Sequence, residues 1–106
     1  MKEFDLRKEA DKNMEYITPK KIREWLAEKI NSRYEEINSV FDPAVGSGQL
    51  FQFVNSKKYI GCDINKRSLE CFKSNFDNTE VFEGNYFNQD IKNYEVAVSN
   101  YPFSLN

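Results

Sequence analysis

What the sequence lacks already narrows its function. It contains no histidine and only two cysteines among 106 residues. Two cysteines make neither a disulfide framework nor a zinc site, so a reduced compartment is the default and no metal centre is expected. No apolar run is long enough for a membrane span or a signal peptide. These absences favour a single cytoplasmic domain and argue against a secreted disulfide-rich protein or a membrane protein.

The sequence also lacks an excess of positive charge. Fifteen Lys and Arg residues are outnumbered by 17 Asp and Glu residues, which gives a net charge of −2, and there is no basic block. A chain that bound nucleic acid unaided should be basic. Aromatic residues, in contrast, are plentiful, with nine Phe, six Tyr and one Trp. They provide a generous supply for the core of a chain of this size.

The stretch from Phe41 to Phe51 is the most informative part of the chain. An apolar run ends in Asp42, passes through a turn containing Gly46 and Gly48, and then becomes apolar again. Glycines allow a backbone to approach a ligand closely, and the N–H groups of a following helix point toward that ligand. This pattern is typical of the first crossover of a Rossmann-type sheet. A nicotinamide or flavin cofactor is disfavoured, because Phe51 occupies the third small position of the dinucleotide fingerprint.

Alternating apolar patterns predict the remaining elements. Thr18 is expected to cap a helix whose first residue is Pro19 and whose apolar stripe packs on a sheet. The stripe consists of Ile22, Leu26, Ile30 and Tyr34, with Trp25 beside it. Strands are predicted at 39–42, 58–63, 80–82 and 94–99, and helices at 49–55 and 65–76, behind a charged arm or helix at 1–15. The alternation predicts an α/β, Rossmann-like fold with a parallel sheet of about four strands and flanking helices.

Two acidic residues end neighbouring predicted strands. Asp42 and Asp63 should therefore lie at the same edge of the sheet. An acid at the end of the second strand can accept hydrogen bonds from a ribose diol. Alternatively, Asp63 and Asn65 serve only to cap the next helix. The Gly84-Asn85 pair after the third strand is likewise typical of an ordinary turn.

Three motifs together resemble a known family. Asp42-Pro43-Ala44-Val45-Gly46-Ser47-Gly48, then Asp63, then Asn100-Tyr101-Pro102-Phe103 resemble the N6-adenine-specific DNA methyltransferases, especially the modification subunits of type I restriction-modification systems. In that family a Thr-Pro segment and an S-adenosyl-L-methionine motif precede an Asn-Pro-Pro-Phe/Tyr catalytic motif, and this sequence keeps that order over about residues 16–103. The resemblance implies a methyltransferase sheet in the order third-second-first-fourth. It also implies methyl transfer to an adenine flipped out of the duplex.

The resemblance also implies roles for individual residues. The cofactor-binding residues would be Tyr16, Thr18 and Pro19 at the methionine end, Asp42, Pro43, Ala44, Gly46 and Gly48 in the loop beneath it, Asp63 on the ribose, and Ile64, Asn85 and Phe87 around the adenine ring. The catalytic motif would be Asn100, Tyr101, Pro102 and Phe103. Asn100 and the next carbonyl would accept the protons of the target amine, and Phe103 would stack on the flipped base. Tyr101 replaces the usual proline, a change that keeps this carbonyl.

Members of the family continue beyond the point at which this sequence ends. We therefore expect residues 16–106 to be a partial catalytic domain, truncated after the Asn-x-Pro-Phe motif. In the cytoplasm of a bacterium or phage-infected cell, it would contact double-stranded DNA with an additional domain or subunit, such as a methyltransferase or specificity subunit. It would also form homo-oligomers through its open fourth strand.

Two alternatives to a DNA methyltransferase remain open. The chain is a non-catalytic remnant of phage or mobile-element type that binds the cofactor or a methyltransferase partner, or it methylates a protein glutamine or an RNA base. Tests of cofactor binding and of methyl transfer to DNA separate the first alternative from a DNA methyltransferase. Substrate profiling with a labelled methyl donor separates the second.

Overall fold

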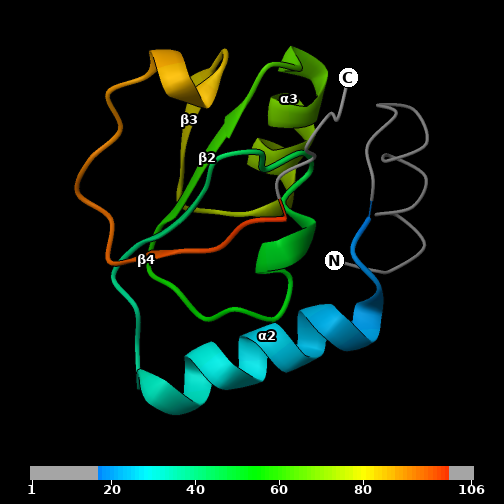
Figure 1. The fold of residues 1–106 in the computed structure, drawn as a ribbon, viewed down its shortest axis with the longest axis vertical. Coiled ribbons are helices and arrows are strands. Elements are labelled where there is room, and N and C mark those ends of the chain that lie inside the picture. The colour runs from blue at the N-terminus through cyan, green and yellow to red at the C-terminus, as the bar shows by residue number, and fades with distance from the viewer. Residues whose placement is uncertain (1–16, 101–106) are drawn as a thin grey trace.

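A computed structural model describes residues 17–100 of the chain (Figure 1). The elements in chain order are α2 (Lys20–Arg33), β1 (Val40–Asp42), the 3₁₀ helix η1 (Gln49–Phe51), β2 (Tyr59–Asp63), α3 (Lys66–Asn75), β3 (Thr79–Glu83), the 3₁₀ helix η2 (Tyr86–Asn88) and β4 (Val96–Ala97). The sheet has the order β3-β2-β1-β4, and every strand pair is parallel. The predicted α/β fold and strand order are therefore confirmed. The predicted arm and the candidate residues Tyr16, Tyr101, Pro102 and Phe103 lie outside the described residues.

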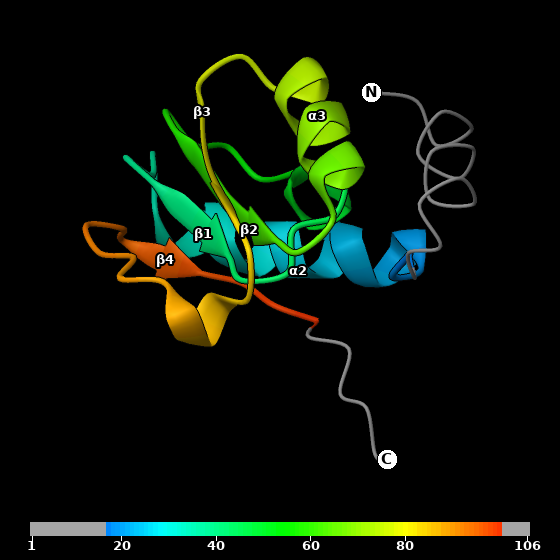
Figure 2. The same ribbon diagram turned by 90° about the horizontal axis from the view of Figure 1, so that it is seen from above.

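The side chains of β1 alternate between two apolar clusters, as the pleat of a strand requires. On one side Val40 joins a core formed with α2, η1 and α3. On the other side Phe41 joins Ile60, Cys62 and aromatic rings of the segment after β3. The ring centroids of Phe41 and Tyr94 are 4.9 Å apart. Figure 2 shows α2 and α3 on one side of the sheet, so the second side is covered by the segment that carries η2.

The start of α2 differs from the prediction. The residue that precedes the first helical turn is Pro19, and no side chain caps the helix. Thr18 is therefore not the N-cap, because its hydroxyl instead accepts a hydrogen bond from Asn100. Pro19 still begins the helical hydrogen bonding, since its carbonyl accepts from the N–H groups of Ile22 and Arg23.

The apolar stripe predicted on α2 is confirmed only in part, because Leu26 and Ile30 pack on the core whereas Ile22 and Tyr34 are exposed. The buried residues of α2 are Arg23, Ala27 and Ile30. Ile22 and Trp25 are 52% and 57% exposed. The helix turns this different face inward because it packs against η1, where small Ala27 permits close approach. Ile22 and Trp25 form an apolar strip of α2 that no other described residue covers.

The helix predicted at 49–55 is reduced to the three residues of η1. Its backbone bonds span three residues, because the Phe51 N–H donates to the Gly48 carbonyl and the Val54 N–H donates to the Phe51 carbonyl. Beyond η1, the Tyr59 hydroxyl donates to the Val54 carbonyl at 2.6 Å, and Asn31 Nδ2 donates to the Phe53 carbonyl at 3.0 Å. The connection from β1 to β2 therefore contains little helix.

The other predicted elements are present with shifted ends. The α3 helix carries buried Leu69 and Phe72, and the Asn65 side chain caps it by accepting from the N–H groups of Arg67 and Ser68. The strand predicted at 94–99 is paired only over Val96–Ala97. Asn93, three positions before this strand, adopts a left-handed conformation with φ of 67°. No helix within residues 17–100 is long and apolar enough to cross a membrane.

Candidate functional site

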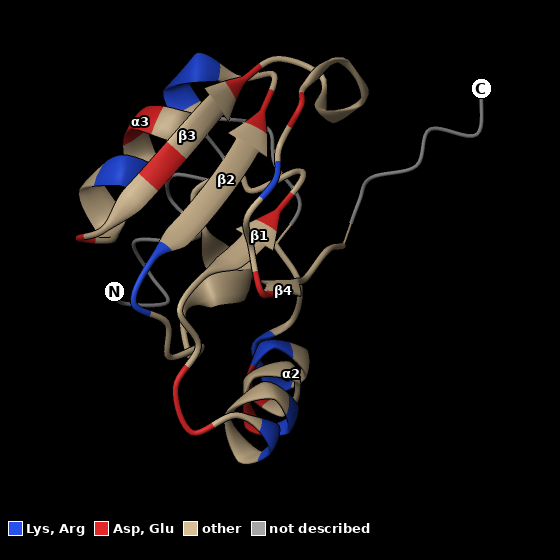
Figure 3. Ribbon diagram, turned by 90° about the vertical axis from the view of Figure 1, so that its left-hand side faces the viewer, with Lys and Arg blue, Asp and Glu red and all other residues tan. Residues whose placement is uncertain are grey.

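The carboxyl ends of the parallel strands gather the predicted site at one edge of the sheet. Asp42, Asp63 and Glu83 are the last residues of β1, β2 and β3. Figure 3 shows this row of acidic residues at the strand tips, whereas Lys and Arg colour much of α2 and α3. Ligands of open α/β sheets bind beyond this edge. The edge of this sheet is therefore negatively charged where a ligand would enter.

The loop after β1 is held by both neighbouring acids. Asp42 Oδ1 accepts from the Ala44 N–H at 2.9 Å, and Asp63 Oδ2 accepts from the Gly46 N–H at 2.8 Å. The Val45 N–H donates to the Cys62 carbonyl at 2.9 Å. Asp42 is 2% exposed. The loop is thus fixed to the ends of two strands before any ligand arrives.

The second glycine of this loop meets the protein core rather than open space. Gly48 has φ of 90°, and a Cβ placed on it would lie 2.5 Å from Cε2 of Phe76 and 2.8 Å from Cδ1 of Phe72. A left-handed backbone and this close contact both require glycine. The need for glycine at this position is therefore explained by packing against α3, whereas the sequence had suggested close approach of a ligand.

The capping interpretation of Asp63 and Asn65 is confirmed for Asn65, and Asp63 also holds the glycine loop. Asn65 caps α3, and Asp63 instead accepts from the N–H groups of Gly46 and Asn65 through different carboxylate oxygens. A carboxylate oxygen has two lone pairs. Each oxygen of half-buried Asp63 can thus accept a further hydrogen bond, as a ribose hydroxyl would require.

Two exposed apolar side chains follow the carboxyl ends of β2 and β3. Ile64, directly after β2, is 75% exposed, and Phe87 in η2 is 77% exposed. Asn85 Oδ1 accepts from the Phe87 N–H at 2.9 Å. Asn85 therefore shapes the turn that carries Phe87, as an ordinary Asx turn does. Two exposed apolar groups at a ligand-binding edge suit a flat aromatic ring.

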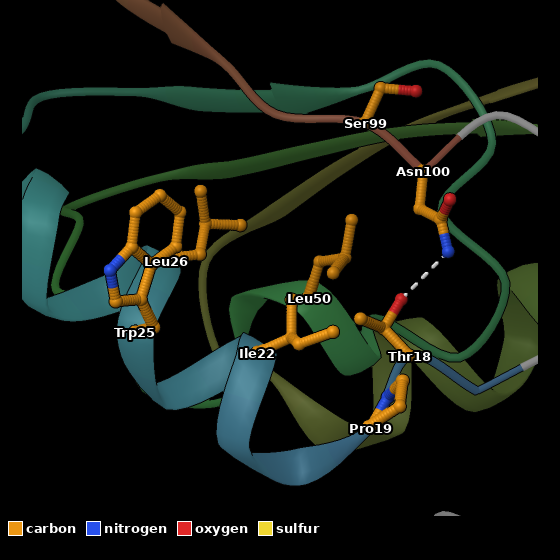
Figure 4. A pocket seen from close by; sticks show the side chains of 8 residues that line it. All are labelled: Thr18, Pro19, Ile22, Trp25, Leu26, Leu50, Ser99 and Asn100. Carbon is orange, nitrogen blue, oxygen red and sulfur yellow. Dashed lines mark hydrogen bonds between the residues drawn. The ribbon is translucent and has the colours of Figure 1, made fainter.

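Asn100 is brought to Thr18 from the far end of the described chain. Asn100 Nδ2 donates to Thr18 Oγ1 at 2.9 Å, across 82 positions of sequence (Figure 4). The Thr18 N–H donates to Gln49 Oε1 at 2.8 Å. Sequence reasoning missed Gln49, although its place directly after Gly48 was a signal that a polar side chain enters the site. The structure thus joins the Thr-Pro segment, the glycine loop and the predicted catalytic asparagine.

A groove of about 340 Å³ opens beside this contact. Its polar end is formed by Thr18 and Asn100, and the apolar strip of α2 forms much of its wall (Figure 4). The lining residues are Thr18, Pro19, Ile22, Trp25, Leu26, Leu50, Ser99 and Asn100. A volume of this size is at the low end of small-molecule sites, which run from roughly 300 Å³ upward.

The charge at the strand tips is reflected in Cys62. Burial, together with the negative charges of Asp63 and Asp42, raises the pKa of the Cys62 thiol to about 11. A thiol of this kind stays protonated at neutral pH, so it is a poor nucleophile and a poor metal ligand. No group of three or more acidic, cysteine or histidine residues within 17–100 could hold a metal ion.

Comparison with known families decides the identity of this fold. The sequence profile described as N-6 DNA methylase matches residues 1–106, the full length of the chain. The chain belongs to the N-6 DNA methylase family. The family relationship agrees with the resemblance inferred from the three motifs. No curated protein matches the chain.

Solved methyltransferase structures share the fold of this N-6 DNA methylase family member. A candidate RNA methyltransferase from Pyrococcus horikoshii superimposes with a TM-score of 0.74 at 21% identity, covering 86% of this chain and 50% of that one. A dimethyladenosine transferase from Plasmodium falciparum gives a TM-score of 0.59 at 24% identity, covering 74% and 32%. The chain thus spans half or less of these structures. The likeness establishes a methyltransferase fold.

Proposed function

We propose that the chain is the cofactor-binding and catalytic half of an adenine-N6 DNA methyltransferase, which transfers the methyl group of S-adenosyl-L-methionine to a flipped adenine. Family membership supports the reaction class. The observation that carries the proposal is the contact of Asn100 with Thr18, because it brings the predicted catalytic residue to the segment expected around the cofactor. Neither residue is near the other in sequence.

The side chains at the sheet edge fit this cofactor. Bound S-adenosyl-L-methionine supplies an electrophilic methyl group on a positively charged sulfonium. The acidic strand tips favour that positive charge. Asp63 retains lone pairs for a ribose diol, and exposed Ile64 and Phe87 can flank the adenine ring. Asn85 Oδ1 can accept from the adenine amino group with its second lone pair.

Other loop residues support the site from beneath. Asp42 is too buried to reach far outward, so it acts by holding the Ala44 N–H. Half-buried Pro43 and Ala44 form the surface of the turn, and Gly46 links the loop to Asp63. Pro19 and Thr18 border the groove next to Asn100. Tyr16 completes the proposed segment.

Asn100 activates the target nitrogen by accepting a hydrogen bond from it. The exocyclic amine of adenine is a weak nucleophile, because its lone pair is delocalised into the ring. Hydrogen bonds from this amine to Asn100 Oδ1 and to the Tyr101 carbonyl draw the nitrogen toward tetrahedral geometry. Positioning of this kind accelerates transfer without a general base of shifted pKa. Phe103 stacks on the flipped base, and Pro102 stiffens the loop that carries Asn100 and Phe103.

Two measurements test the proposal in order. Calorimetric titration of the chain with S-adenosyl-L-methionine should show saturable binding at one site. Labelled methyl transfer, with the chain complemented by its DNA-reading partner, should then favour duplex DNA and be lost in Asn100→Ala. Absence of cofactor binding would favour a non-catalytic remnant. Preferential labelling of RNA or of protein glutamine would reassign the substrate.

A further inference from the structure

Three segments meet in one row of hydrogen bonds beside the groove. Gln49 Oε1 accepts from the Thr18 N–H at 2.8 Å, and Thr18 Oγ1 accepts from Asn100 Nδ2 at 2.9 Å. Thr18 is 5% and Gln49 8% exposed. The bond between Thr18 and Gln49 is thus buried, where a hydrogen bond is stronger than in solvent. The bond from exposed Asn100 is buried only on the Thr18 side.

In the contact with Thr18, the Asn100 amide turns its nitrogen end toward the hydroxyl. A primary amide has a donor end and an acceptor end of nearly equal size, and the two are exchanged by a half-turn of the group. Here the nitrogen end is the one bound to Thr18 (Figure 4). The oxygen end consequently points away from Thr18 and stays available as an acceptor.

We propose that Thr18 and Gln49 are positioning residues that lock the Asn100 amide with its oxygen directed toward the methyl-accepting amine. The inference rests on the proposed function, in which Asn100 Oδ1 accepts a hydrogen bond from that amine. A half-turn of the amide would set an NH₂ group against the NH₂ group of the substrate. Two donors would then face each other. Because a threonine hydroxyl can donate as well as accept, the proposed orientation requires Thr18 Oγ1 to act as the acceptor, as it does in this contact.

Gln49 is needed because the Thr18 N–H is buried where no regular element supplies an acceptor. Thr18 stands two positions before α2, and a buried N–H without a partner is costly. Gln49 provides this acceptor directly after the glycine loop, which Asp63 holds at Gly46. The position of the loop is thereby passed to Thr18 and on to the Asn100 amide. The same frame would hold cofactor and acceptor in mutual register.

The side-chain amide resonances of Asn100 test the lock directly in the ¹⁵N-labelled full-length chain. They are assigned by their loss in Asn100→Ala. In the wild type, one of the two Nδ2 protons should exchange with water more slowly than the other, because it is donated to Thr18. Thr18→Val keeps the shape and removes the hydroxyl, so it should shift both resonances and equalise the two exchange rates. Thr18→Ser should restore the wild-type pattern.

A variant of Gln49 and a control variant at the chain's second threonine complete the experiment. Gln49→Met removes the acceptor at similar size, so it should accelerate exchange of the Thr18 backbone amide and also shift the Asn100 side-chain resonances. Thr79→Val, at the chain's other threonine, should leave them unchanged. Dispersed backbone resonances in each variant show that it is folded.

Several results would overturn the inference. Equal exchange of both Nδ2 protons in the wild type would mean that the amide is not held by its nitrogen. Unmoved Asn100 resonances in folded Thr18→Val would remove Thr18 from the lock, and the same result in Gln49→Met would remove Gln49. These spectra need neither cofactor nor DNA. Failure to bind S-adenosyl-L-methionine would thus refute the proposed function independently of the lock.

A kinetic measurement in the complemented enzyme separates positioning from general stability. Thr18→Val should lower kcat by on the order of 10²-fold, the scale of a misplaced reacting group, with little change in KM for DNA. Thr18→Ser should recover most of that loss. Equal kcat in Thr18→Val and the wild type would show that the orientation of Asn100 does not limit transfer.

Discussion

Single side chains at the strand edge bind more than one partner, and Asp63 shows why this matters. Its two carboxylate oxygens hold the Gly46 N–H of the glycine loop and the Asn65 N–H at the start of α3. A cofactor hydroxyl would be a third partner. Replacing Asp63 therefore affects both the shape of the loop and the affinity for a ligand, and a useful experiment has to separate these effects.

Asp63→Ala should weaken S-adenosyl-L-methionine binding by about 1–3 kcal/mol, the cost of leaving a hydrogen-bond partner unpaired. Calorimetry measures the affinity, and urea unfolding of the same variant reports how much of the loss is structural. Asp77→Ala, an exposed acid in the turn before β3, has the same change of charge and serves as the control. Affinity equal to that of the wild type would exclude Asp63 from the cofactor site.

Cys62 should make the folding stability depend on alkaline pH. The folded chain raises the pKa of this thiol from 9.0 to about 11, chiefly by burial. The unfolded chain then releases its proton first, so this contribution to stability is complete below about pH 9 and is lost as the pH rises toward 11. Urea unfolding at pH 8 and pH 10.5 should show a larger drop for the wild type than for Cys62→Ala. Parallel pH profiles for the two proteins would contradict the burial of a protonated thiol.

At the scale of elements, the connection between β1 and α3 is packed more tightly than a ligand-binding loop needs. The glycine loop lies on the Phe72 and Phe76 rings of α3, and Gly61 of β2 leaves room for Val45. The loop is thus part of the core on one side and borders the site on the other. Its conformation should be set by folding, with little left for a ligand to induce.

Gly48→Ala should destabilise the fold by roughly 2 kcal/mol or more, because overpacking and a left-handed alanine both cost free energy. The added Cβ would meet Phe76 and Phe72. Urea unfolding measures the loss, with the exposed substitution Ser74→Ala on α3 as the comparison. A Gly48→Ala protein as stable as the wild type would mean that the loop moves away from α3 easily.

At the scale of the whole molecule, the net charge and the open sheet edge lead us to expect that the chain needs a partner to bind DNA and that it associates through β4. The net charge is −2, and acidic residues cluster at the carboxyl edge of the sheet. The last strand, β4, pairs with β1 through the N–H groups of Val96 and Val98. The alternate residue, Ala97, therefore turns its N–H outward and has no strand partner on that side within residues 17–100.

We expect the isolated chain to show no measurable adenine methylation on duplex DNA. Phosphate contacts dominate DNA affinity, and a chain with a net charge of −2 supplies few of them. Labelled methyl transfer to duplex oligonucleotides measures the activity, and the complemented enzyme provides the positive control. Robust methylation by the pure chain that disappears in Asn100→Ala would contradict this expectation.

We also expect the chain to associate through β4, because an open strand edge is a template for pairing. Light scattering at rising concentration should show oligomers, and Ser99→Lys should reduce them by placing a charge next to the edge. Ser74→Lys on the outer face of α3 carries the same charge change and should have no effect. A stable monomer at high concentration, with Ala97 strongly protected from hydrogen exchange, would exclude pairing at this edge.

The sequence by itself determined the parallel sheet and the residues at its carboxyl edge. Both follow from short-range patterns, since buried parallel strands read as apolar runs and their ends carry the polar residues. The strand order was predicted from the family resemblance. Helix α3 was predictable for the same reason, because Asn65 and the Leu69 and Phe72 pair act within a few positions of one another. The motif order likewise indicated the methyltransferase family without any tertiary information.

Only the tertiary structure decided where the longer-range contacts of those motifs go. Thr18 has the residue type of a helix cap, yet its hydroxyl is bound to Asn100 and its N–H to Gln49. The inward face of α2 and the short length of η1 were set by packing against distant side chains such as Tyr59. Local propensities are worth only fractions of a kcal/mol per residue, whereas buried contacts between distant segments are worth more and outweigh them.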